Sequence, residues 1–397
     1  MTLPFLFILV FMVGTFCPLI YSYLPFLGNI RIVFFSIIAS MVTYLFARHR
    51  YNNFNAFHNP IYISWIFFFF AMIFSIPFSM DKGLSLKILN GNLLILLMMS
   101  IMIKIVDNSR RLVLLINTLC LCVVVMAGSA VFNYIFNKEM LLAYRTRSLT
   151  LGLFADPNDL ATLLNAFSPL LLYHIFHEKR KTVIACAGIF LTIFAIILTY
   201  SRAGFLSILT TLICVFCLIK PNKVRYWLGG FGVVVFFLLV VPDNYVQRLS
   251  TIFMDSENGQ LADDRHVAWV VGIKKGLENP FVGVGVGCSF YLFGSLMDQW
   301  LSVHNSFIQV FLENGIFGLI PYCLLFIFPI MQYRKLKRSN FPKDALFLQK
   351  ILLISCATYG VSIFFKHLNK FLFQTCIDCI NFTNSFLSNY LMQARQD

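Results

Sequence analysis

Apolar stretches of about 20 residues recur along the whole chain, and this repetition limits the folds that it can adopt. A helix of that length is long enough to cross the hydrocarbon core of a bilayer. We expect about twelve spans, at the following positions: 3–23, 26–47, 60–80, 88–105, 112–137, 158–176, 182–199, 203–219, 226–242, 306–332, 348–366 and 370–391. The sequence therefore predicts an all-α polytopic membrane protein.

The composition excludes a soluble domain of this size. Of the 397 residues, 59% are hydrophobic and only 12% are charged, whereas a typical soluble domain has roughly 25% charged residues. Surface scaling does not allow a chain of this length to bury nearly all of its side chains in water. No internal repeat or low-complexity linker divides the chain, so we expect residues 1–397 to form a single transmembrane domain.

The net charge of +14 indicates membrane orientation and not a nucleic-acid partner, because Lys and Arg cluster in short turns. With spans counted from a cytoplasmic N-terminus, the ends of the even-numbered spans face inward, and the short turns there are basic, as the positive-inside rule requires. The basic residues of the inward-facing turns are the following: Arg48, Arg50, Lys104, Arg110, Arg111, Lys179, Arg180, Lys181, Lys220, Lys223, Arg225, Arg334, Lys335, Lys337 and Arg338. This pattern predicts a multi-pass membrane protein with these turns on the cytoplasmic side.

The opposite face is expected to carry one large periplasmic loop with short helices, 243–305, about sixty residues long. Loops of this length in a compact protein usually carry function. Few basic residues are expected on this face, and they include Arg145, Arg147, Arg202, Arg248 and Arg265; its histidines are His266, His304 and His367. Each of these residues is therefore a candidate for a functional role.

Arg202 stands in Leu198-Thr199-Tyr200-Ser201-Arg202-Ala203-Gly204, where two expected spans meet with almost no loop between them. An arginine at the membrane boundary is costly unless it pairs or extends to the interface. One interpretation is an interfacial anchor. The other is a diphosphate clamp, because a guanidinium group matches phosphate oxygens and keeps its charge.

Arg265 and His304 are the candidates within the loop. Arg265 follows Asp263-Asp264 and is expected in the first turn of a helix that ends at Asn279-Pro280. There it would bind an anion together with the helix N-terminus, or form an exposed Asp–Arg pair. His304 precedes Asn305-Ser306, which can cap the next helix. Its imidazole suits a general base, and a structural interfacial histidine is the alternative.

Asp156-Pro157-Asn158-Asp159 opens the span 158–176 and has the pattern of a helix N-terminus. An equally open interpretation is that its carboxylates bind sugar hydroxyls or a cation. Glu313 lies inside the span after His304 and should face the bundle interior. The run Gly283-Val284-Gly285-Val286-Gly287 favours a flexible or tightly turned loop over a phosphate loop, because no Walker lysine follows it. No zinc, EF-hand, Walker or Ser-His-Asp pattern is present in the sequence.

These segments, in this order and spacing, resemble the O-antigen ligase and polymerase superfamily of bacterial inner membranes. The matching residues are Ser201-Arg202-Ala203-Gly204, Arg265 with Glu278-Asn279-Pro280, Gly283, Gly285, Gly287, His304-Asn305-Ser306, Glu313-Asn314-Gly315-Ile316-Phe317-Gly318 and Asp156-Pro157-Asn158-Asp159. The resemblance covers about 150–320 at the level of motifs, and the hydropathy layout extends it over the rest.

The resemblance implies a GT-C-like glycosyltransferase that acts at the periplasmic face on a glycan carried by undecaprenyl diphosphate. The acceptor is lipid A core in the ligases, another lipid-linked repeat unit in the polymerases, and a protein hydroxyl in related oligosaccharyltransferases. The family's essential arginines and histidine fall on Arg202, Arg265 and His304. The reaction is expected to be inverting, without cofactor or metal, although the aspartates could bind a cation. Substrate-binding candidates are Asp156, Asn158, Asp159, Asn305 and Glu313.

The expected function is that of an O-antigen ligase, with a repeat-unit polymerase as a close alternative because such motifs are shared. The expected partners are the undecaprenyl-diphosphate-linked glycan, a lipid A-core or glycan acceptor, and membrane lipid. A flippase or transporter would require charged residues at mid-membrane and often two related halves, and mid-span polar residues are few. A non-catalytic assembly scaffold would tolerate replacement of Arg202, Arg265 or His304.

Overall fold

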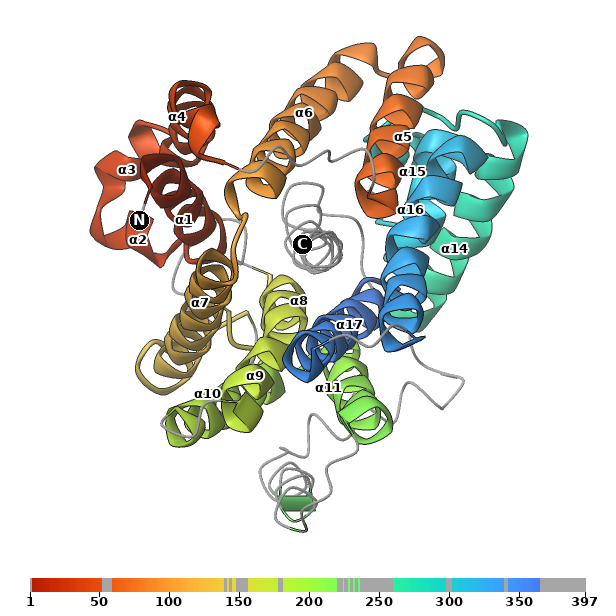
Figure 1. The fold of residues 1–397 in the computed structure, drawn as a ribbon. Coiled ribbons are helices and arrows are strands. Elements are labelled where there is room, and N and C mark those ends of the chain that lie inside the picture. The colour runs from red at the N-terminus through yellow and green to blue at the C-terminus, as the bar shows by residue number, and fades with distance from the viewer. Residues whose placement is uncertain are drawn as a thin grey trace. The chain divides into compact units, whose positions relative to one another are not determined.

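The structure is a computed structural model, and it describes the following residues: 2–51, 59–138, 141–142, 145–147, 156–177, 181–219, 224, 228, 231–232, 235, 260–297, 302–338 and 342–364. Regular secondary structure within these residues is helical (Figure 1). The principal helices are α1 Leu3–Phe16, α2 Leu19–Tyr23, α3 Pro25–Asn29, α4 Ile32–Ala47, α5 Pro60–Ser75, α6 Lys82–Ile105, α7 Ser109–Phe136, α8 Pro157–Phe167, α9 Leu171–His177, α10 Thr182–Leu198, α11 Arg202–Cys214, α14 Gln260–Glu278, α15 Ser289–Met297, α16 Ser306–Arg338 and α17 Lys343–Phe364.

The helices are those of a membrane protein. In the described part of the chain, 8 helical segments are long and apolar enough to cross a bilayer, and α1 and α10 are shorter apolar helices. The prediction of an all-α polytopic membrane protein is therefore confirmed. Two of the expected spans, 226–242 and 370–391, lie almost wholly outside the described residues. The count of about twelve spans, the GT-C-like class and the membrane side of each loop stay predictions.

Proline divides two of the expected spans into pairs of helices. The span 3–23 is split at Pro18, between α1 and α2, and 158–176 is split at Pro169, between α8 and α9. Proline has no backbone N–H, and its ring clashes with the preceding turn, so a helix that reaches it bends or ends. Hydropathy alone does not register this effect, because the residues on both sides of each proline are apolar.

The chain forms two compact units. Unit 1 comprises Met1–Arg50, Ile105–Met254 and Leu336–Ser362, and unit 2 comprises Tyr51–Lys104, Asp255–Lys335 and Ile363–Asp397. The single transmembrane domain expected over 1–397 stays a prediction. Of the loop expected at 243–305, the structure describes α14, α15 and the residues next to them, all within unit 2.

Unit 1 is held together by small and polar side chains as well as by apolar packing. The hydroxyl groups of Ser207 and Ser362 lie 2.7 Å apart, and those of Thr211 and Thr358 lie 2.8 Å apart. These two pairs join α11 to α17. Hydrogen bonds between hydroxyl groups commonly join helices in a membrane, where burial of apolar surface alone gives little driving force between helices.

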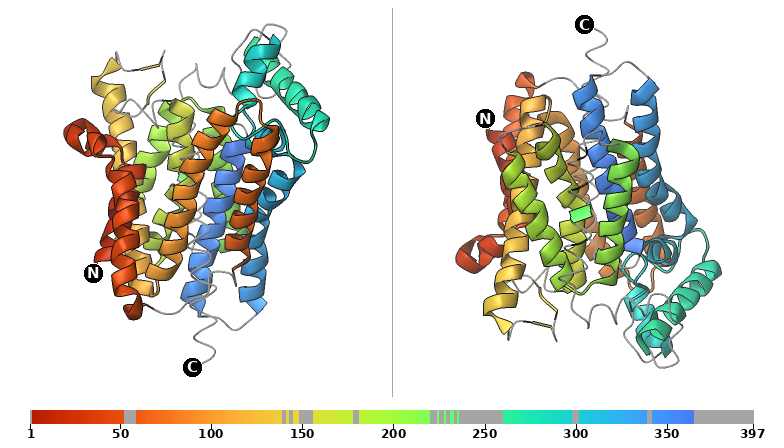
Figure 2. Two further views of the ribbon diagram at one scale, coloured as in Figure 1. Left: turned by 90° about the horizontal axis from the view of Figure 1, so that it is seen from above. Right: turned by 90° about the horizontal axis from the view of Figure 1, so that it is seen from below.

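Unit 2 is built around buried aromatic side chains. The ring of Tyr322 on α16 lies 5.5 Å from the ring of Phe68 on α5, which in turn contacts Trp65 at 5.6 Å. A second buried cluster joins α14, α15 and the start of α16, and it contains Ala268, Val284, Cys288, Leu292, Phe293, Val303 and Leu312. In unit 2, α5, α6 and α16 run lengthwise, whereas α14 is inclined to them (Figure 2).

Candidate functional site

The candidate residues are divided between the two units. Unit 1 contains Asp156, Asn158, Asp159 and Arg202, and unit 2 contains Arg265, His304, Asn305 and Glu313. The Asp156–Asp159 segment, Arg202, His304 and Asn305 lie at helix N-termini or just before them, whereas Arg265 and Glu313 lie within helices. In both units, candidate residues form hydrogen bonds with partners that the sequence does not predict.

Arg202 is the first residue of α11. The preceding Ser201 is buried, and its Oγ atom accepts a hydrogen bond from the backbone N–H of Gly204 at 3.2 Å, which caps the helix. Tyr200 has a φ of 51°, in the left-handed region that few residues other than glycine adopt. This conformation lets the chain reverse between α10 and α11 without a longer loop. The sequence prediction that two helices meet almost directly at Arg202 is thus confirmed.

Gly204 allows the first turn of α11 to approach its neighbours closely. A Cβ atom at this position would lie 3.0 Å from Cγ2 of Ile196 and 3.3 Å from Cβ of Ala161. The Nδ2 atom of Asn165, on α8, donates to the carbonyl oxygen of Gly204 at 3.3 Å. Gly204 therefore allows close packing of the first turn of α11. This packing fixes the position of Arg202, the first residue of that helix.

The Asp156–Asp159 segment forms the N-terminus of α8, as its pattern predicts. The Oδ1 atom of Asp156 accepts a hydrogen bond from the backbone N–H of Asn158 at 2.6 Å, and Pro157 occupies the first helical position. Asp159 lies in the first turn and is largely buried. This geometry accounts for Asp156 as a helix cap, and the role of the segment in substrate binding stays a proposal.

Arg145 joins this segment to the turn before Arg202. Its Nη2 atom donates to Oδ1 of Asn158 at 2.8 Å, and its Nε atom donates to the carbonyl oxygen of Thr199, also at 2.8 Å. The sequence alone marks Arg145 as one of the few arginines of its face but gives it no role. The scarcity of basic residues on that face is the signal in the sequence that could have identified Arg145. The partners of its guanidinium group depend on tertiary structure and cannot be predicted in this way.

Arg265 lies further along its helix than expected. The sequence predicts it in the first turn, but α14 begins at Gln260, so the free N–H groups of the helix end precede it. Gln260, Leu261 and Ala262 all favour helix, which explains the upstream extension. The backbone of Arg265 is helical, and its side chain lies outside what the structure describes.

His304 has a φ of 51° and immediately precedes the cap of α16. The Oδ1 atom of the buried Asn305 accepts hydrogen bonds from the N–H groups of Phe307 at 3.0 Å and Ile308 at 3.1 Å. The predicted cap is therefore present. A left-handed conformation at a residue other than glycine is uncommon and persists when its surroundings hold it. This backbone conformation fixes the direction of the partly exposed His304 relative to the start of α16.

Glu313 is fully buried, at 0% exposure, and both of its carboxylate oxygens are bonded within unit 2. The Oε2 atom accepts from the backbone N–H of Gly287 at 2.8 Å. The Oε1 atom accepts from the hydroxyl of Ser289 at 2.6 Å and from Nε2 of Gln309 at 2.9 Å. The carboxylate thus lies at the N-terminus of α15, where a negative charge is favourable. Its expected orientation toward the interior is what the structure shows.

The glycine-rich run forms a strap that docks on α16, and "strap" below means residues 279–288. Its backbone N–H groups from Gly283 to Cys288 are all bonded within unit 2. The acceptors are, in order, the carbonyl oxygens of Asn279, Leu312 and Glu313, Oγ of Ser75, Oε2 of Glu313 and the carbonyl oxygen of Gly285. The strap is a tight turn, as predicted, and its amide groups are committed to protein partners and not available to cradle a phosphate.

A break in α16 makes room for the strap. Gly315 has φ 60° and ψ −161°, which is not helical. The N–H of Ile316 therefore donates to the carbonyl oxygen of Pro280 at 2.7 Å and not back along its own helix. A Cβ atom at Gly315 would lie 2.2 Å from the carbonyl carbon of Phe281. The glycines of the strap and of the Glu313-Asn314-Gly315 motif thus form one interlocking element.

Comparison with known families converges on the same segments. Residues 187–323 match the family model described as O-antigen ligase. This segment of the chain is similar to the O-antigen ligase family. The resemblance drawn from the motifs is therefore confirmed. No curated protein matches the chain.

The O-antigen ligase segment includes Arg202, Arg265, His304 and the whole strap with its partner Glu313. Asp156–Asp159 and Arg145 precede it. Within the segment, the structure accounts for the helix caps and glycines through local hydrogen bonds and close packing. Chemical roles for Arg202, Arg265 and His304 are proposals, and they are given below.

Proposed function

We propose that the protein is a glycosyltransferase that moves a glycan from undecaprenyl diphosphate onto lipid A core. The observation that carries this proposal is the family match over residues 187–323, which contains Arg202, Arg265 and His304. An activity of the O-antigen ligase or polymerase type follows from the family. The lipid-linked donor, the lipid A-core acceptor and the residues that act on them are the proposed refinements.

The proposed reaction is a single displacement with inversion. The hydroxyl oxygen of the acceptor attacks the anomeric carbon of the donor sugar, and the bond from that carbon to the diphosphate oxygen breaks. Undecaprenyl diphosphate leaves with the bonding electron pair. His304 takes the proton of the acceptor hydroxyl. Because the donor is already activated, the proposed reaction uses no metal, cofactor or covalent enzyme intermediate.

Arg202 and Arg265 are proposed to bind the donor diphosphate. Both guanidinium groups keep their charge across the physiological pH range and can donate two parallel hydrogen bonds to phosphate oxygens. Negative charge grows on the leaving diphosphate as the bond breaks, so donors that already face it stabilise the transition state. The position of Arg202 at a capped helix N-terminus adds favourable backbone dipoles on the same side.

The proposed substrate-binding residues are Asp156, Asn158, Asp159 and Asn305, whose polar groups are suited to sugar hydroxyls. Glu313 has a different proposed role. Because both of its oxygens are bonded to the strap, to α15 and to Gln309, we assign it to positioning the loop and not to direct contact with the sugar. Asn158 is already bonded to Arg145, so its proposed contact with substrate would share that amide oxygen.

The proposed location is the bacterial inner membrane, with the active site facing the periplasm. We also propose about twelve spans in a GT-C-like arrangement, with 243–305 as the periplasmic loop. The basic turns at the ends of the even-numbered spans support this orientation. Alkaline phosphatase inserted between residues 250 and 251 should be active, since the enzyme folds only outside the cytoplasm. Inactivity of that fusion, with activity of one placed after Arg180, would reverse the orientation.

A lipopolysaccharide gel from a deletion strain tests the transferase proposal. We expect loss of all O-antigen, accumulation of long lipid-linked polymer, and recovery with the wild-type chain. Arg202→Ala, Arg265→Ala and His304→Ala should reach normal membrane levels without recovery, whereas the exposed Lys274→Ala should recover fully. Core that carries a single repeat unit would indicate the polymerase instead. An unchanged ladder would contradict both activities on lipopolysaccharide.

A further inference from the structure

An exposed apolar stripe on α14 is unexplained by the packing of unit 2. Val270, Ile273 and Leu277 recur at helical spacing and are all exposed, Leu277 to 63%. The opposite side of α14 already packs on α16, because Gly272 lies against Ile308 and Gly276 against Phe311. The helix therefore has one apolar side that packs on α16 and a second apolar side that stays exposed.

Polar residues border the stripe on one side only. Lys274 and Glu278 are exposed, and Nζ of Lys275 lies 2.9 Å from a carboxylate oxygen of Glu278. A surface helix of a soluble protein would present such polar residues over its whole free side. The arrangement on α14, with charges beside an exposed apolar stripe, is that of a helix that lies in a membrane–water interface.

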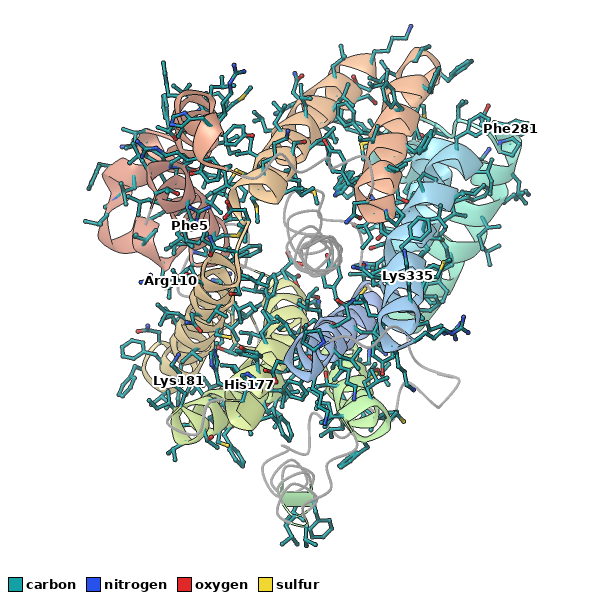
Figure 3. The ribbon with its side chains drawn as sticks, viewed as in Figure 1. Phe5, Arg110, His177, Lys181, Phe281 and Lys335 are labelled. Atoms are coloured by element: carbon teal, nitrogen blue, oxygen red, sulfur yellow. The ribbon has the colours of Figure 1, made fainter. Side chains whose placement is uncertain are left out.

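The stripe continues onto a membrane span. Phe281, just after α14, is exposed to 61%, and its ring lies 5.7 Å from the ring of Phe317 on α16. Phe317 and Ile320 are exposed as well, on a helix that is long and apolar enough to cross a bilayer. Figure 3 shows Phe281 at the outer edge of unit 2, beside α14 and α16.

The join between stripe and span is rigid. The carbonyl oxygen of Phe281 accepts a hydrogen bond from the N–H of Phe317 at 3.4 Å, and that of Pro280 accepts from Ile316 at 2.7 Å. Gly315 leaves no space for the strap to shift toward α16, because even a Cβ atom there would lie 2.2 Å from the Phe281 backbone. The apolar stripe is therefore held in register with the exposed apolar side of α16 that carries Phe317 and Ile320.

We propose that α14 lies at the bilayer surface, with Val270, Ile273, Leu277 and Phe281 among the lipid acyl chains. Lys274, beside the stripe, would then reach the phosphate groups of the lipid heads. The occupant of this surface is the host bilayer itself, because the stripe continues a surface that a membrane span presents to lipid. This proposal does not depend on the transferase chemistry and would hold for any activity of the chain.

Photo-cross-linking in nanodiscs tests this placement. The full chain carries benzoyl-phenylalanine in place of Leu277, and a matched protein carries it in place of Lys275, which lies on the side of α14 away from the stripe. Ile320 is replaced in a third protein as a control for contact with lipid. We expect lipid adducts from positions 277 and 320 in similar yield, and a several-fold lower yield from position 275.

Two results would overturn the proposal. One is a yield of lipid adduct from position 277 no higher than from position 275 while position 320 reacts normally. The other is cross-linking of position 277 to a second copy of the chain or to another protein in place of lipid. Nanodiscs of the unsubstituted protein, with a photoreactive acyl chain in the lipid and adducts mapped by mass spectrometry, answer the same question if the Leu277 protein does not fold. Adducts at the stripe would then support the proposal, and their absence would contradict it.

Discussion

The carboxylate of Glu313 lies 2.8 Å from the backbone nitrogen of Gly287 and accepts its hydrogen bond beside the break in α16. The same side chain binds Ser289, the first residue of α15, at 2.6 Å. One buried carboxylate therefore ties the strap, α15 and α16 together. His304 leads into this same α16, so the position of the proposed base depends on an element that Glu313 holds in place.

Replacement of Glu313 by glutamine should destabilise unit 2. An amide has one acceptor oxygen and two donors, so its nitrogen would face the N–H of Gly287 or the donors at Ser289 and Gln309. Loss of a charged hydrogen bond with a buried donor left unsatisfied costs roughly 1–3 kcal/mol. Thermal unfolding of the purified protein in detergent measures this loss.

Glu278→Gln is the matched control, because Glu278 is exposed and forms a surface ion pair with Lys275. Exposed pairs contribute less than about 1 kcal/mol, so this variant should unfold near the wild-type temperature. Equal unfolding temperatures for the two glutamine variants would contradict the role assigned to Glu313.

Gly315→Ala should be among the most damaging small substitutions in the chain. The added Cβ would meet the Phe281 backbone at 2.2 Å, and φ at this position is 60°. This combination of φ 60° and ψ −161° is essentially restricted to glycine and costs a residue with a Cβ roughly 1–3 kcal/mol, and the clash falls on backbone that is itself hydrogen-bonded to α16. We expect poor accumulation in the membrane, measured by quantitative immunoblot.

Gly91→Ala, in the middle of α6, is the control for the glycine substitution. No atom lies within 4 Å of the Cβ that it would add. Alanine in a helix interior is more favourable than glycine by roughly 0.5–1 kcal/mol, so normal or raised abundance is expected. Normal abundance of the Gly315 variant would mean that the strap can undock from α16, which contradicts the rigid join between them.

Arg145→Met should loosen the turn that precedes Arg202. The variant keeps most of the apolar stem but removes the donors to Thr199 and Asn158, both at 2.8 Å. We expect a lower unfolding temperature, and Arg145→Lys should not restore it fully because one ammonium cannot match both acceptors. Lys138→Met, an exposed basic residue of the same region, should have little effect. Full stability of Arg145→Met would show that the two hydrogen bonds are dispensable.

The helices of the chain follow from its sequence, whereas the strap does not. Apolar stretches and prolines are local signals, and the caps at Asp156, Ser201 and Asn305 follow from residue type and position. The break at Gly315 is different, because it exists only where residues 279–288 replace the helix's own hydrogen-bond partners. The glycines at 283, 285 and 315 are the sequence signal of this break. Their local sequence does not indicate that the first two pack against the segment that contains the third.

Electrostatic partners are equally hidden in the sequence. Glu313 lies inside an expected span and is expected to face inward, yet its partners Gly287 and Ser289 come from a separate segment. Arg145 is visible only as a basic residue in a turn. The upstream start of α14 escapes prediction because Asp263-Asp264 has the pattern of a helix cap, although the residues before it favour helix as well.

His304→Asn separates the backbone requirement of this position from its chemistry. Asparagine tolerates the left-handed conformation, so the variant should fold and accumulate normally at φ 51°. It has no group that can take a proton near neutral pH, so glycan transfer should fall by roughly 10²–10⁴-fold, the usual contribution of a general base. Transfer at the wild-type rate by His304→Asn would remove the proposed base.

Glycan transfer by the purified protein tests the central claim most directly. The full chain in nanodiscs is supplied with an undecaprenyl-diphosphate-linked glycan and lipid A core, without added nucleotide, and the product is followed by mass spectrometry. We predict glycosylated lipid A core and free undecaprenyl diphosphate from the wild-type and Lys274→Ala proteins, and neither product from folded Arg202→Ala, Arg265→Ala or His304→Ala. Undiminished transfer by all three of those variants would contradict the proposed function of these residues.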